Sequence, residues 1–258
     1  MSEQEISELL SELTEKAKGA RNKLMLLDFD GTLVEFTPDP AETKPSKNLL
    51  DLLYKIAVAC ENRLVIITGR RQDDIDRMVG HLPVDIIAEH GAIIREHGQW
   101  GFLLNAGSDW KNETRNIMQR YCEISPDSFI EEKHFSLVWH FRKLSPELAL
   151  TRPVELVRSL ASVVKENGLK VMNGKKVVEV IDTNINKGKA TKYFLEKHPY
   201  DYILSVGDDT TDEDMFCVLQ NLEHAVTVKI GEGNTCAKYK LENIQQVLRL
   251  LENFKVKD

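Results

Sequence analysis

Short apolar segments that alternate with helical segments are the feature of this sequence that most restricts its fold. The segments are continuously apolar, which is typical of strands buried on both faces of a parallel sheet. They are residues 24–30 (LMLLDFD), 63–69 (RLVIITG), 84–89 (VDIIAE), 201–208 (DYILSVGD) and 225–231 (AVTVKIG). Helical patterns lie at Ser46–Cys60, Gln72–Val79, Lys189–Lys197, Glu213–Leu219 and Asn243–Phe254. The alternation predicts an α/β fold with a Rossmann-like open parallel sheet and right-handed crossovers.

The middle of the chain departs from this rhythm. A helical stretch after Asp109 is followed by two strand-like segments, and a second helix near Glu147–Asn167 is followed by two more. The four strand-like segments are residues 128–134 (SFIEEKH), 136–142 (SLVWHFR), 169–174 (LKVMNG) and 176–182 (KVVEVID). Helix–strand–strand twice over predicts an α+β module with an antiparallel sheet. We therefore expect an insert at 109–180 in a discontinuous core formed by 1–108 and 181–258.

Composition excludes several classes of protein. The chain has 258 residues and a net charge of -7, which argues against a nucleic-acid binder because such proteins need a basic face. No apolar run approaches the roughly 18–20 residues of a membrane span. Residues 1–20 are charged, with helical spacing and no secretory apolar core. The cysteines Cys60, Cys122, Cys217 and Cys236 are scattered, which indicates reduced core thiols in a cytoplasmic protein.

Carboxylates gather where two of the predicted strands end. Asp28 and Asp30 lie two residues apart, so in an extended strand their side chains point the same way. The stretch 206–216 (VGDDTTDEDMF) follows another strand and carries Asp208, Asp209, Asp212, Glu213 and Asp214. Taken singly, these features also fit a D-G turn and a solvated acidic loop.

Side chains that could bind an anion occur after one further predicted strand and before one predicted helix. Thr68 ends a strand, Gly69 lets a backbone approach an anion, and Arg70 and Arg71 add positive charge. Lys187 directly precedes a helix. Each of these has an ordinary alternative, a helix cap or a solvated side chain. Taken together, the carboxylates and the anion-binding groups favour a different interpretation. Carboxylates at neighbouring strand ends repel each other unless a cation lies between them. A site with oxygen ligands alone favours Mg²⁺ as that cation. A carboxylate, a divalent cation and an anion cradle are what phosphoryl transfer through an aspartyl-phosphate requires.

These segments also carry a family resemblance. "DFDGTL", Thr68, Lys187 and "GDDTTDEDMF" occur in the order of the four signature motifs of haloacid dehalogenase (HAD) superfamily phosphatases. "EHGAIIR" (89–95), residues 128–142 and residues 173–190 resemble blocks of the trehalose-6-phosphate phosphatases, and the resemblance runs from about Leu24 to Leu219. It implies a HAD-like core, a cap formed by the insert, and Mg²⁺-dependent hydrolysis of trehalose 6-phosphate in trehalose biosynthesis.

The resemblance assigns a role to each core position. Asp28 would be the nucleophile, and Asp30 the general acid and then the base. Thr68 and Lys187 would hold the phosphoryl oxygens, and Gly69 and Arg70 would adjoin the substrate. The metal site would comprise Asp28, Asp30 through its backbone carbonyl, Asp208 and Asp212. Either Asp209 or Asp212 would orient a metal-bound water or Lys187, and we favour Asp212.

The insert supplies candidates for sugar recognition. The family match favours Glu131, Lys133 and Glu179 as contacts to the disaccharide. His140 and Arg142 would either contact the substrate or stabilise the cap. The ordinary alternative for all five is a solvated sheet face with cross-strand ion pairs.

Two further functions remain compatible with the sequence. The same chemistry could act on another sugar phosphate, such as sucrose phosphate or mannosyl-glycerate phosphate. The second alternative function is a non-catalytic sugar-phosphate sensor. The sequence argues against it, because a protein that only binds a sugar phosphate need not keep a nucleophile and a general acid. Association with a trehalose-phosphate synthase is the expected partnership.

Overall fold

The computed structural model describes residues 2–37, 42–59, 61–104, 107–174 and 176–256, and it divides the chain into two compact units. The large unit is Met1–Leu103 with Asn186–Asp258, and the small unit is Leu104–Ile185. The sequence-based borders fell after residues 108 and 180. The second of these would cut strand β9 (Val177–Asp182), which pairs with its neighbours inside the small unit.

The large unit is built on a sheet with the strand order β12-β11-β10-β1-β2-β3-β4-β5. Its strands are β1 (Lys23–Asp28), β2 (Asn62–Ile67), β3 (Asp85–Ala88), β4 (Ile93–Glu96), β5 (Gln99–Phe102), β10 (Tyr202–Gly207), β11 (Ala225–Ile230) and β12 (Tyr239–Leu241). From β12 to β3 all neighbours are parallel, which confirms the predicted Rossmann-like α/β core. Strand β1 lies between β10 and β2, so the carboxyl ends of these three strands meet at one edge.

The far edge of this sheet was not predicted. Strands β4 and β5 pair antiparallel to β3 and to each other, so the sheet is mixed rather than wholly parallel. They form a short hairpin that turns at His97 and Gly98, both of which have positive φ. Strand β5 (QWGF) is largely exposed, and so it lacks the apolar run by which the other strands were recognised.

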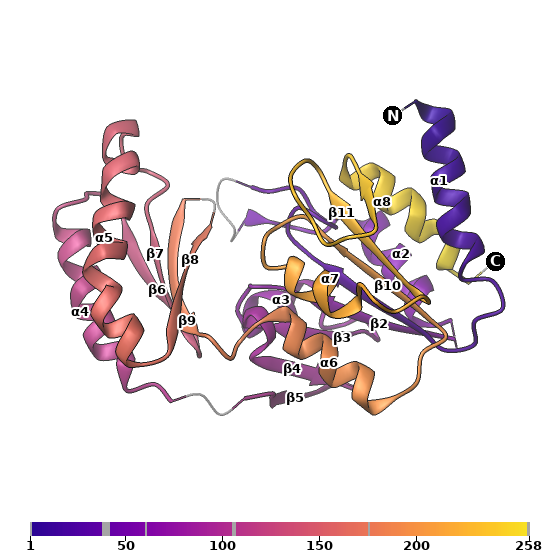
Figure 1. The fold of residues 1–258 in the computed structure, drawn as a ribbon, viewed down its shortest axis with the longest axis horizontal. Coiled ribbons are helices and arrows are strands. Elements are labelled where there is room, and N and C mark those ends of the chain that lie inside the picture. Colours follow the sequence, from indigo (N-terminus) through magenta and orange to yellow (C-terminus); the bar gives the residue numbers. More distant parts are fainter. Residues whose placement is uncertain (1, 38–41, 60, 105–106, 175, 257–258) are drawn as a thin grey trace. The chain divides into compact units, whose positions relative to one another are not determined.

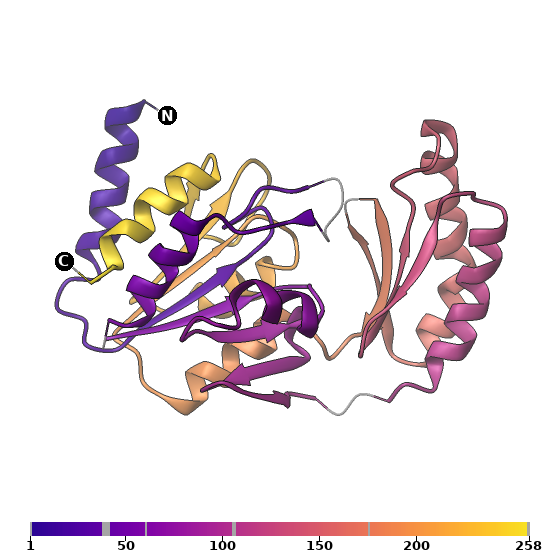
Figure 2. The ribbon, with the colours of Figure 1, turned by 180° about the vertical axis from the view of Figure 1, so that it is seen from behind.

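Helices cover both faces of the large sheet. They are α1 (Glu3–Glu15), α2 (Lys47–Ala57), α3 (Gln72–Val79), α6 (Lys187–Lys197), α7 (Glu213–Leu219) and α8 (Ile244–Leu251), with short 3₁₀ turns at Glu89–Gly91 and Glu252–Phe254. Figures 1 and 2 show α6 and α7 on one face and α2 and α8 on the other. On the first face, Phe194 and Phe216 pack against Leu24, Val65 and Ile203. Each fully buried side chain of this size contributes about 1.5–3 kcal/mol, so this packing anchors α6 and α7 to the sheet.

Capping side chains decide where two of the helices begin. Ser46 accepts a hydrogen bond from the backbone of Leu49, and Asn186 accepts one from the backbone of Lys189 at 2.8 Å. Both are residues favoured at N-caps because the side-chain oxygen satisfies an otherwise free amide. The Asn186 cap makes Lys187 the first residue of α6, two residues before the predicted start.

The small unit has the predicted helix–strand–strand repeat. Its elements are α4 (Trp110–Glu123), β6 (Phe129–Glu132), β7 (Ser136–His140), α5 (Pro146–Glu166), β8 (Leu169–Gly174) and β9. The strands form an antiparallel sheet in the order β6-β7-β9-β8. Helices α4 and α5 lie on one face of it (Figure 1), around a core that includes Trp139, Leu156 and Val178.

The cysteines differ from the expectation of core thiols. Cys122 is partly buried, whereas Cys217 and Cys236 are exposed, and all three are free. They stand on an outward helix face or in a loop, which the scattered spacing could not reveal. Cys60 lies outside the described residues.

Among the described helices, none combines the length and the apolar character required to cross a bilayer.

Candidate active site

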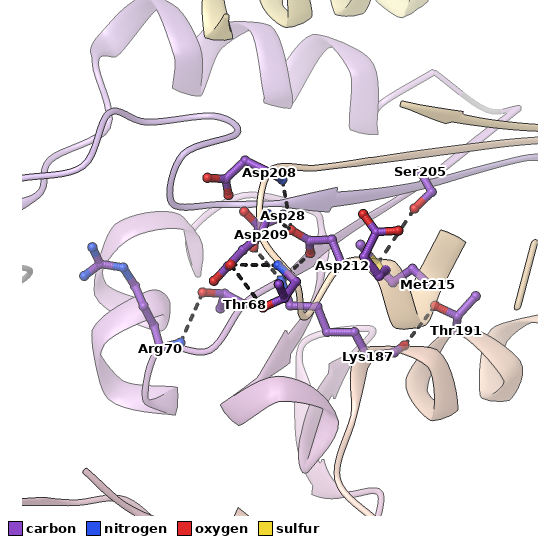
Figure 3. A network of polar contacts seen from close by, with 12 residues as sticks. Asp28, Thr68, Arg70, Lys187, Thr191, Ser205, Asp208, Asp209, Asp212 and Met215 are labelled. Atoms are coloured by element: carbon purple, nitrogen blue, oxygen red, sulfur yellow. Dashed lines mark hydrogen bonds and ion pairs between the residues drawn. The ribbon is translucent and has the colours of Figure 1, made fainter. Parts of the chain in front are cut away.

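Three carboxylates converge at the carboxyl edge of the central strands. Asp28 ends β1, Asp208 follows β10, and Asp212 lies just before α7. One carboxylate oxygen from each lies within 4.8 Å of the others. Figure 3 shows this group with Asp209 close by and with Lys187 reaching toward it from α6. The pairing of β1 with β10 in parallel register therefore brings two segments about 180 residues apart into one site.

A buried lysine holds two of these carboxylates. Lys187 Nζ donates to Asp28 Oδ1 at 2.6 Å and to Asp212 Oδ1 at 2.7 Å, and its side chain is only 2% exposed. Burial alone would lower the pKa of Lys187, but Asp212 and Asp28 outweigh it and raise that pKa well above its usual value. The ammonium is thus charged and fixed between its partners.

The remaining charge fits a cation. Burial raises the pKa of Asp28 well above its usual value, and Asp212 adds to the rise while Lys187 opposes it. Asp28 Oδ2 is buried and has no hydrogen-bond partner among the described residues. A buried, unsatisfied carboxylate oxygen beside two further carboxylates is unfavourable unless a positive ion approaches it. Oxygen ligands of this kind suit Mg²⁺.

Asp212 is occupied on both oxygens. Oδ1 accepts from Lys187, and Oδ2 accepts from the backbone amides of Asp208 and Asp209, each at 2.9 Å. The Asp209 carboxylate instead accepts from Thr210, and Asp209 is exposed. Of the two alternatives left by the sequence, Asp212 is the one that contacts Lys187.

Asp30 has a partner that the sequence did not suggest. Arg70 Nε donates to Asp30 Oδ2 at 2.7 Å and Arg70 Nη2 donates to Asp30 Oδ1 at 2.6 Å. Arg70 Nη2 also donates to Thr43 Oγ1 at 2.9 Å. Arg70 was expected beside the substrate, but in this structure its guanidinium engages the candidate general acid.

The loop after β2 is held by the 3₁₀ turn at Glu89–Gly91. The buried Thr68 accepts a hydrogen bond from the backbone of Arg70 at 3.1 Å, and its carbonyl accepts one from the backbone of His90 at 3.0 Å. A Cβ at Gly69 would lie 2.3 Å from His90 Cε1, so the glycine allows the imidazole to pack on this loop. His90 belongs to the segment EHGAIIR, and its φ of 59° is an unusual backbone conformation for a residue other than glycine. The sequence reasoning missed its role.

Lys229 is a second residue that the sequence reasoning missed. It lies near the end of β11, is 6% exposed, and donates from Nζ to the backbone carbonyl of Asp208. Its Nζ also lies 3.9 Å from Glu213 Oε1. Lys229 thereby supports the backbone of the acidic loop. A lysine inside the otherwise apolar run AVTVKI was the signal that could have found it.

Glycine at position 31 allows the first motif to approach the acidic loop. Gly31 has φ 86°, and a Cβ there would lie 2.4 Å from Asp208 Oδ2. Any side chain would therefore displace Asp208 from its place beside Asp28.

The small unit brings its predicted residues into two pairs. Lys133 Nζ donates to Glu179 Oε1 at 3.0 Å, and Glu179 also accepts from Ser136 Oγ. His140 Nε2 lies 2.8 Å from Glu131 Oε2. The strand register places Glu131 and Glu179 on either side of Val138, on one face of the sheet. The Glu131–His140 pair is a cross-strand contact of the kind that the sequence left open. Lys133 instead lies in the turn after β6, and its pair with Glu179 is buried rather than solvated.

Arg142, unlike His140, lies outside the strands of the small unit. Strand β7 ends at His140, and Arg142 lies in an exposed turn, so the two residues do not share a strand face.

Lys111 of α4 supports the turn between β6 and β7, because its buried Nζ donates to the carbonyls of Lys133 and His134 at 2.7 and 2.8 Å. The sequence analysis did not single it out.

The fold and the carboxylates define a class of protein. The chain resembles a haloacid dehalogenase-like hydrolase from Bacteroides thetaiotaomicron with a TM-score of 0.65, over 90% of this chain and 98% of that one, at 14% identity. That likeness establishes the HAD-like fold. The profile of the trehalose-phosphatase family matches residues 26–245, and the chain belongs to that family.

Closer relatives agree with this membership. The C-terminal domain of the C. albicans trehalose-6-phosphate phosphatase is 30% identical, with a TM-score of 0.87 over 94% of each chain. The bifunctional trehalose-6-phosphate synthase/phosphatase of Thermoproteus tenax is 36% identical over 92% of this chain and 32% of its own length. The chain spans about a third of the length of the curated relatives that it matches first.

Proposed function

We propose that this chain is a phosphatase that hydrolyses trehalose 6-phosphate to trehalose and phosphate. The observation that carries the proposal is the buried Lys187 held between Asp28 and Asp212 at the strand ends, in a chain of the trehalose-phosphatase family. A nucleophilic carboxylate, a fixed cation and a group of converging carboxylates that could hold a metal suit attack on a phosphate ester.

Asp28 is the proposed nucleophile. Lys187 holds Oδ1, which leaves Oδ2 as the oxygen without a described partner. Attack on phosphorus forms a phospho-aspartate and breaks the bond to the sugar oxygen. Asp30 gives a proton to that oxygen and later takes one from the water that hydrolyses the intermediate. Thr68 and Lys187 hold the phosphoryl oxygens.

The cofactor that suits this site is Mg²⁺. Asp28, Asp208 and the Asp30 carbonyl would hold it, and Asp212 would orient Lys187 and the Asp208 backbone. When bound, Mg²⁺ supplies positive charge that offsets repulsion between a carboxylate and a phosphate dianion.

Recognition of the sugar is proposed to come from the small unit. Glu131 pairs with His140 and Glu179 pairs with Lys133, and carboxylates can accept from sugar hydroxyls while lysine can donate. Glu131→Gln is expected to raise KM for trehalose 6-phosphate about tenfold with a smaller change in kcat, since it removes a contact made before the chemical step. Glu123→Gln, an exposed change in the same unit, is the matched control.

Two further proposals concern the surroundings of the enzyme. A cytoplasmic location agrees with the free cysteines among the described residues. Association with a trehalose-phosphate synthase is supported by the bifunctional relative from Thermoproteus tenax.

The test is phosphate release from a panel of sugar phosphates, with Mg²⁺ and with a chelator. We expect fastest release from trehalose 6-phosphate, loss of activity with chelator and recovery on adding Mg²⁺. Faster turnover of sucrose phosphate or a monosaccharide phosphate would reject the substrate assignment. No turnover, with binding of the same compounds retained, would favour a sensor. Borohydride reduction of an acid-quenched reaction should convert Asp28 to homoserine, and Asp28→Asn should abolish that product.

A further inference from the structure

Two exposed cysteines from different structural elements lie near each other in the large unit. Cys217 is on α7, and Cys236 is in the segment between β11 and β12. The sequence separates them by 19 residues, and nothing in their spacing pairs them. Neither belongs to the candidate active site.

The backbone of Cys236 is anchored to the helix that carries Cys217. Its amide donates to Glu213 Oε2 at 2.7 Å. Glu213 is the first residue of α7, and Cys217 follows it by four positions, so both side chains lie on the same face of the helix. The hydrogen bond therefore places Cys236 over the helix face from which Cys217 projects.

The Cys236 thiol also influences the charge state of Cys217. A hydrogen bond with Cys236, together with burial and the charges of Glu213 and Asp214, raises the pKa of Cys217 to about 11. Cys217 thus keeps its proton at neutral pH.

We propose that Cys217 and Cys236 are a reversible thiol–disulfide pair, oxidised within one chain to a disulfide that links α7 to the segment between β11 and β12. The inference is independent of the proposed phosphatase activity. Reactive pairs in reducing compartments are typically transient disulfides of this exposed kind.

Glutathione disulfide is the oxidant by chemical class. The Cys236 thiolate attacks one of its sulfurs, forms a mixed disulfide and releases a glutathione thiolate. Cys217 then loses its proton to solvent, and its thiolate attacks the Cys236 sulfur and releases the second glutathione. Two protein thiols are oxidised while one glutathione disulfide is reduced to two glutathione molecules.

The disulfide would restrain a region that adjoins the acidic loop. Glu213, which holds the Cys236 amide, also faces Lys229, and Lys229 donates to the carbonyl of Asp208. The link therefore joins the loop after β11 to α7, whose first residue, Glu213, faces the lysine that supports Asp208.

The test incubates the full chain with glutathione disulfide and maps the peptides without reduction. We expect a disulfide-linked peptide that contains Cys217 and Cys236, reversed by dithiothreitol, while Cys122 in the small unit serves as the internal reference. In Cys217→Ser the resolving thiol is gone, so the glutathione adduct on Cys236 should rise about tenfold above that of the unaltered protein. Because both side chains are exposed, Cys217→Ser and Cys236→Ser should keep the thermal unfolding midpoint nearly unchanged.

Three results would overturn the proposal. The first is a glutathione adduct on Cys236 as abundant in the unaltered protein as in Cys217→Ser. The second is a linked peptide that pairs either cysteine with Cys60 or Cys122 instead. The third is a linkage formed only between two chains, seen as a dimer under non-reducing conditions.

Discussion

Arg70 and Asp30 form a two-point ion pair, with Nε and Nη2 of the guanidinium 2.7 and 2.6 Å from the two carboxylate oxygens. Both oxygens of the candidate general acid are therefore engaged by one side chain. For Asp30 to give a proton to a leaving oxygen, at least one of these contacts has to open. The arginine predicted to adjoin the substrate thus controls the orientation of another candidate catalytic residue.

Replacing Arg70 should measure the strength of this pair. Arg70→Met leaves Asp30 without its guanidinium, and we expect a loss of about 2 kcal/mol of unfolding free energy, below the value for a fully buried pair. The Asp30 side chain remains 24% exposed, which lets water compensate in part. Urea unfolding measures the change. Thr43→Val keeps the ion pair but removes the Arg70–Thr43 hydrogen bond and the 2.8 Å hydrogen bond between Thr43 Oγ1 and Thr37 Oγ1. It should lose about 1 kcal/mol. Equal losses in both variants would show that the ion pair adds no stability.

Removing Lys187 should destabilise the acidic centre. In Lys187→Met, Asp28 and Asp212 face each other without a cation, and we expect a loss of about 3–5 kcal/mol in urea unfolding without metal. The proposed phosphatase activity should fall by roughly 10²–10³ because a fixed positive charge is lost. The double variant Lys187→Met with Asp212→Asn should recover part of the stability but not the activity. A double variant no more stable than Lys187→Met would contradict the electrostatic explanation.

Adding Mg²⁺ should stabilise the protein through Asp208. At 100 times its dissociation constant, a ligand that binds only the folded state adds about 2.7 kcal/mol. We expect Mg²⁺ to raise the thermal unfolding midpoint, and Asp208→Asn to remove most of this rise. Asp209→Asn is the matched control, because the Asp209 side chain is exposed and accepts its hydrogen bonds from the neighbouring Thr210. If Asp209→Asn abolished the rise and Asp208→Asn kept it, the metal assignment would be wrong.

Lys229 should tune the affinity for Mg²⁺ from outside its ligand set. Lys229→Met removes the donor to the Asp208 carbonyl, and the expected loss of Mg²⁺ affinity is about tenfold, as is typical when support for a ligand is removed. Titration calorimetry measures the affinity directly, without relying on turnover. Lys229→Arg keeps a donor and should recover part of it. Lys240→Met, on the neighbouring strand β12, alters only an exposed contact to the Gly233 carbonyl and should leave the affinity unchanged.

Stability in acid should depend on Glu96, at the end of β4. Burial would raise the pKa of Glu96, but hydrogen bonds from Lys197, Arg63 and Tyr193 outweigh it and lower the pKa from 4.5 to about 2. Because the pKa is lower in the folded state, the carboxylate stabilises the fold above pH 4.5, and this stabilisation is lost as the pH falls toward 2.

Glu96→Gln should therefore be less stable than the unaltered protein at pH 7, with the difference shrinking between pH 4.5 and 2. Urea unfolding across this range measures it, and the exposed Glu123→Gln is the control. A stability difference that stayed constant with pH would show that the ionised carboxylate is not its cause.

Local patterns in the sequence were enough to predict the framework. The apolar run before Asp28 and the run before Asp208 are continuous because both strands are buried on two faces, and this signal does not depend on the rest of the fold. The repeat of one helix and two strands in the small unit could be predicted as well, because it too is a local pattern that does not depend on the rest of the fold. Because the carboxyl ends of parallel strands meet at one edge, the order of the motifs also predicted that Asp28 and Asp208 would come together, and their carboxylates do so.

The sequence by itself thus determined the alternation of the parallel strands β1, β2, β3, β10 and β11 with helices, the helix–strand–strand repeat and the position of the acidic residues along the chain. Only the tertiary structure decided that Arg70 pairs with Asp30, that Lys229 supports Asp208, and that the Cys236 amide binds Glu213 on the helix that carries Cys217. The physical reason is range: periodicity records how a segment meets the core, whereas the partner of a polar side chain depends on which distant segment the folded chain brings within about 3 Å of it.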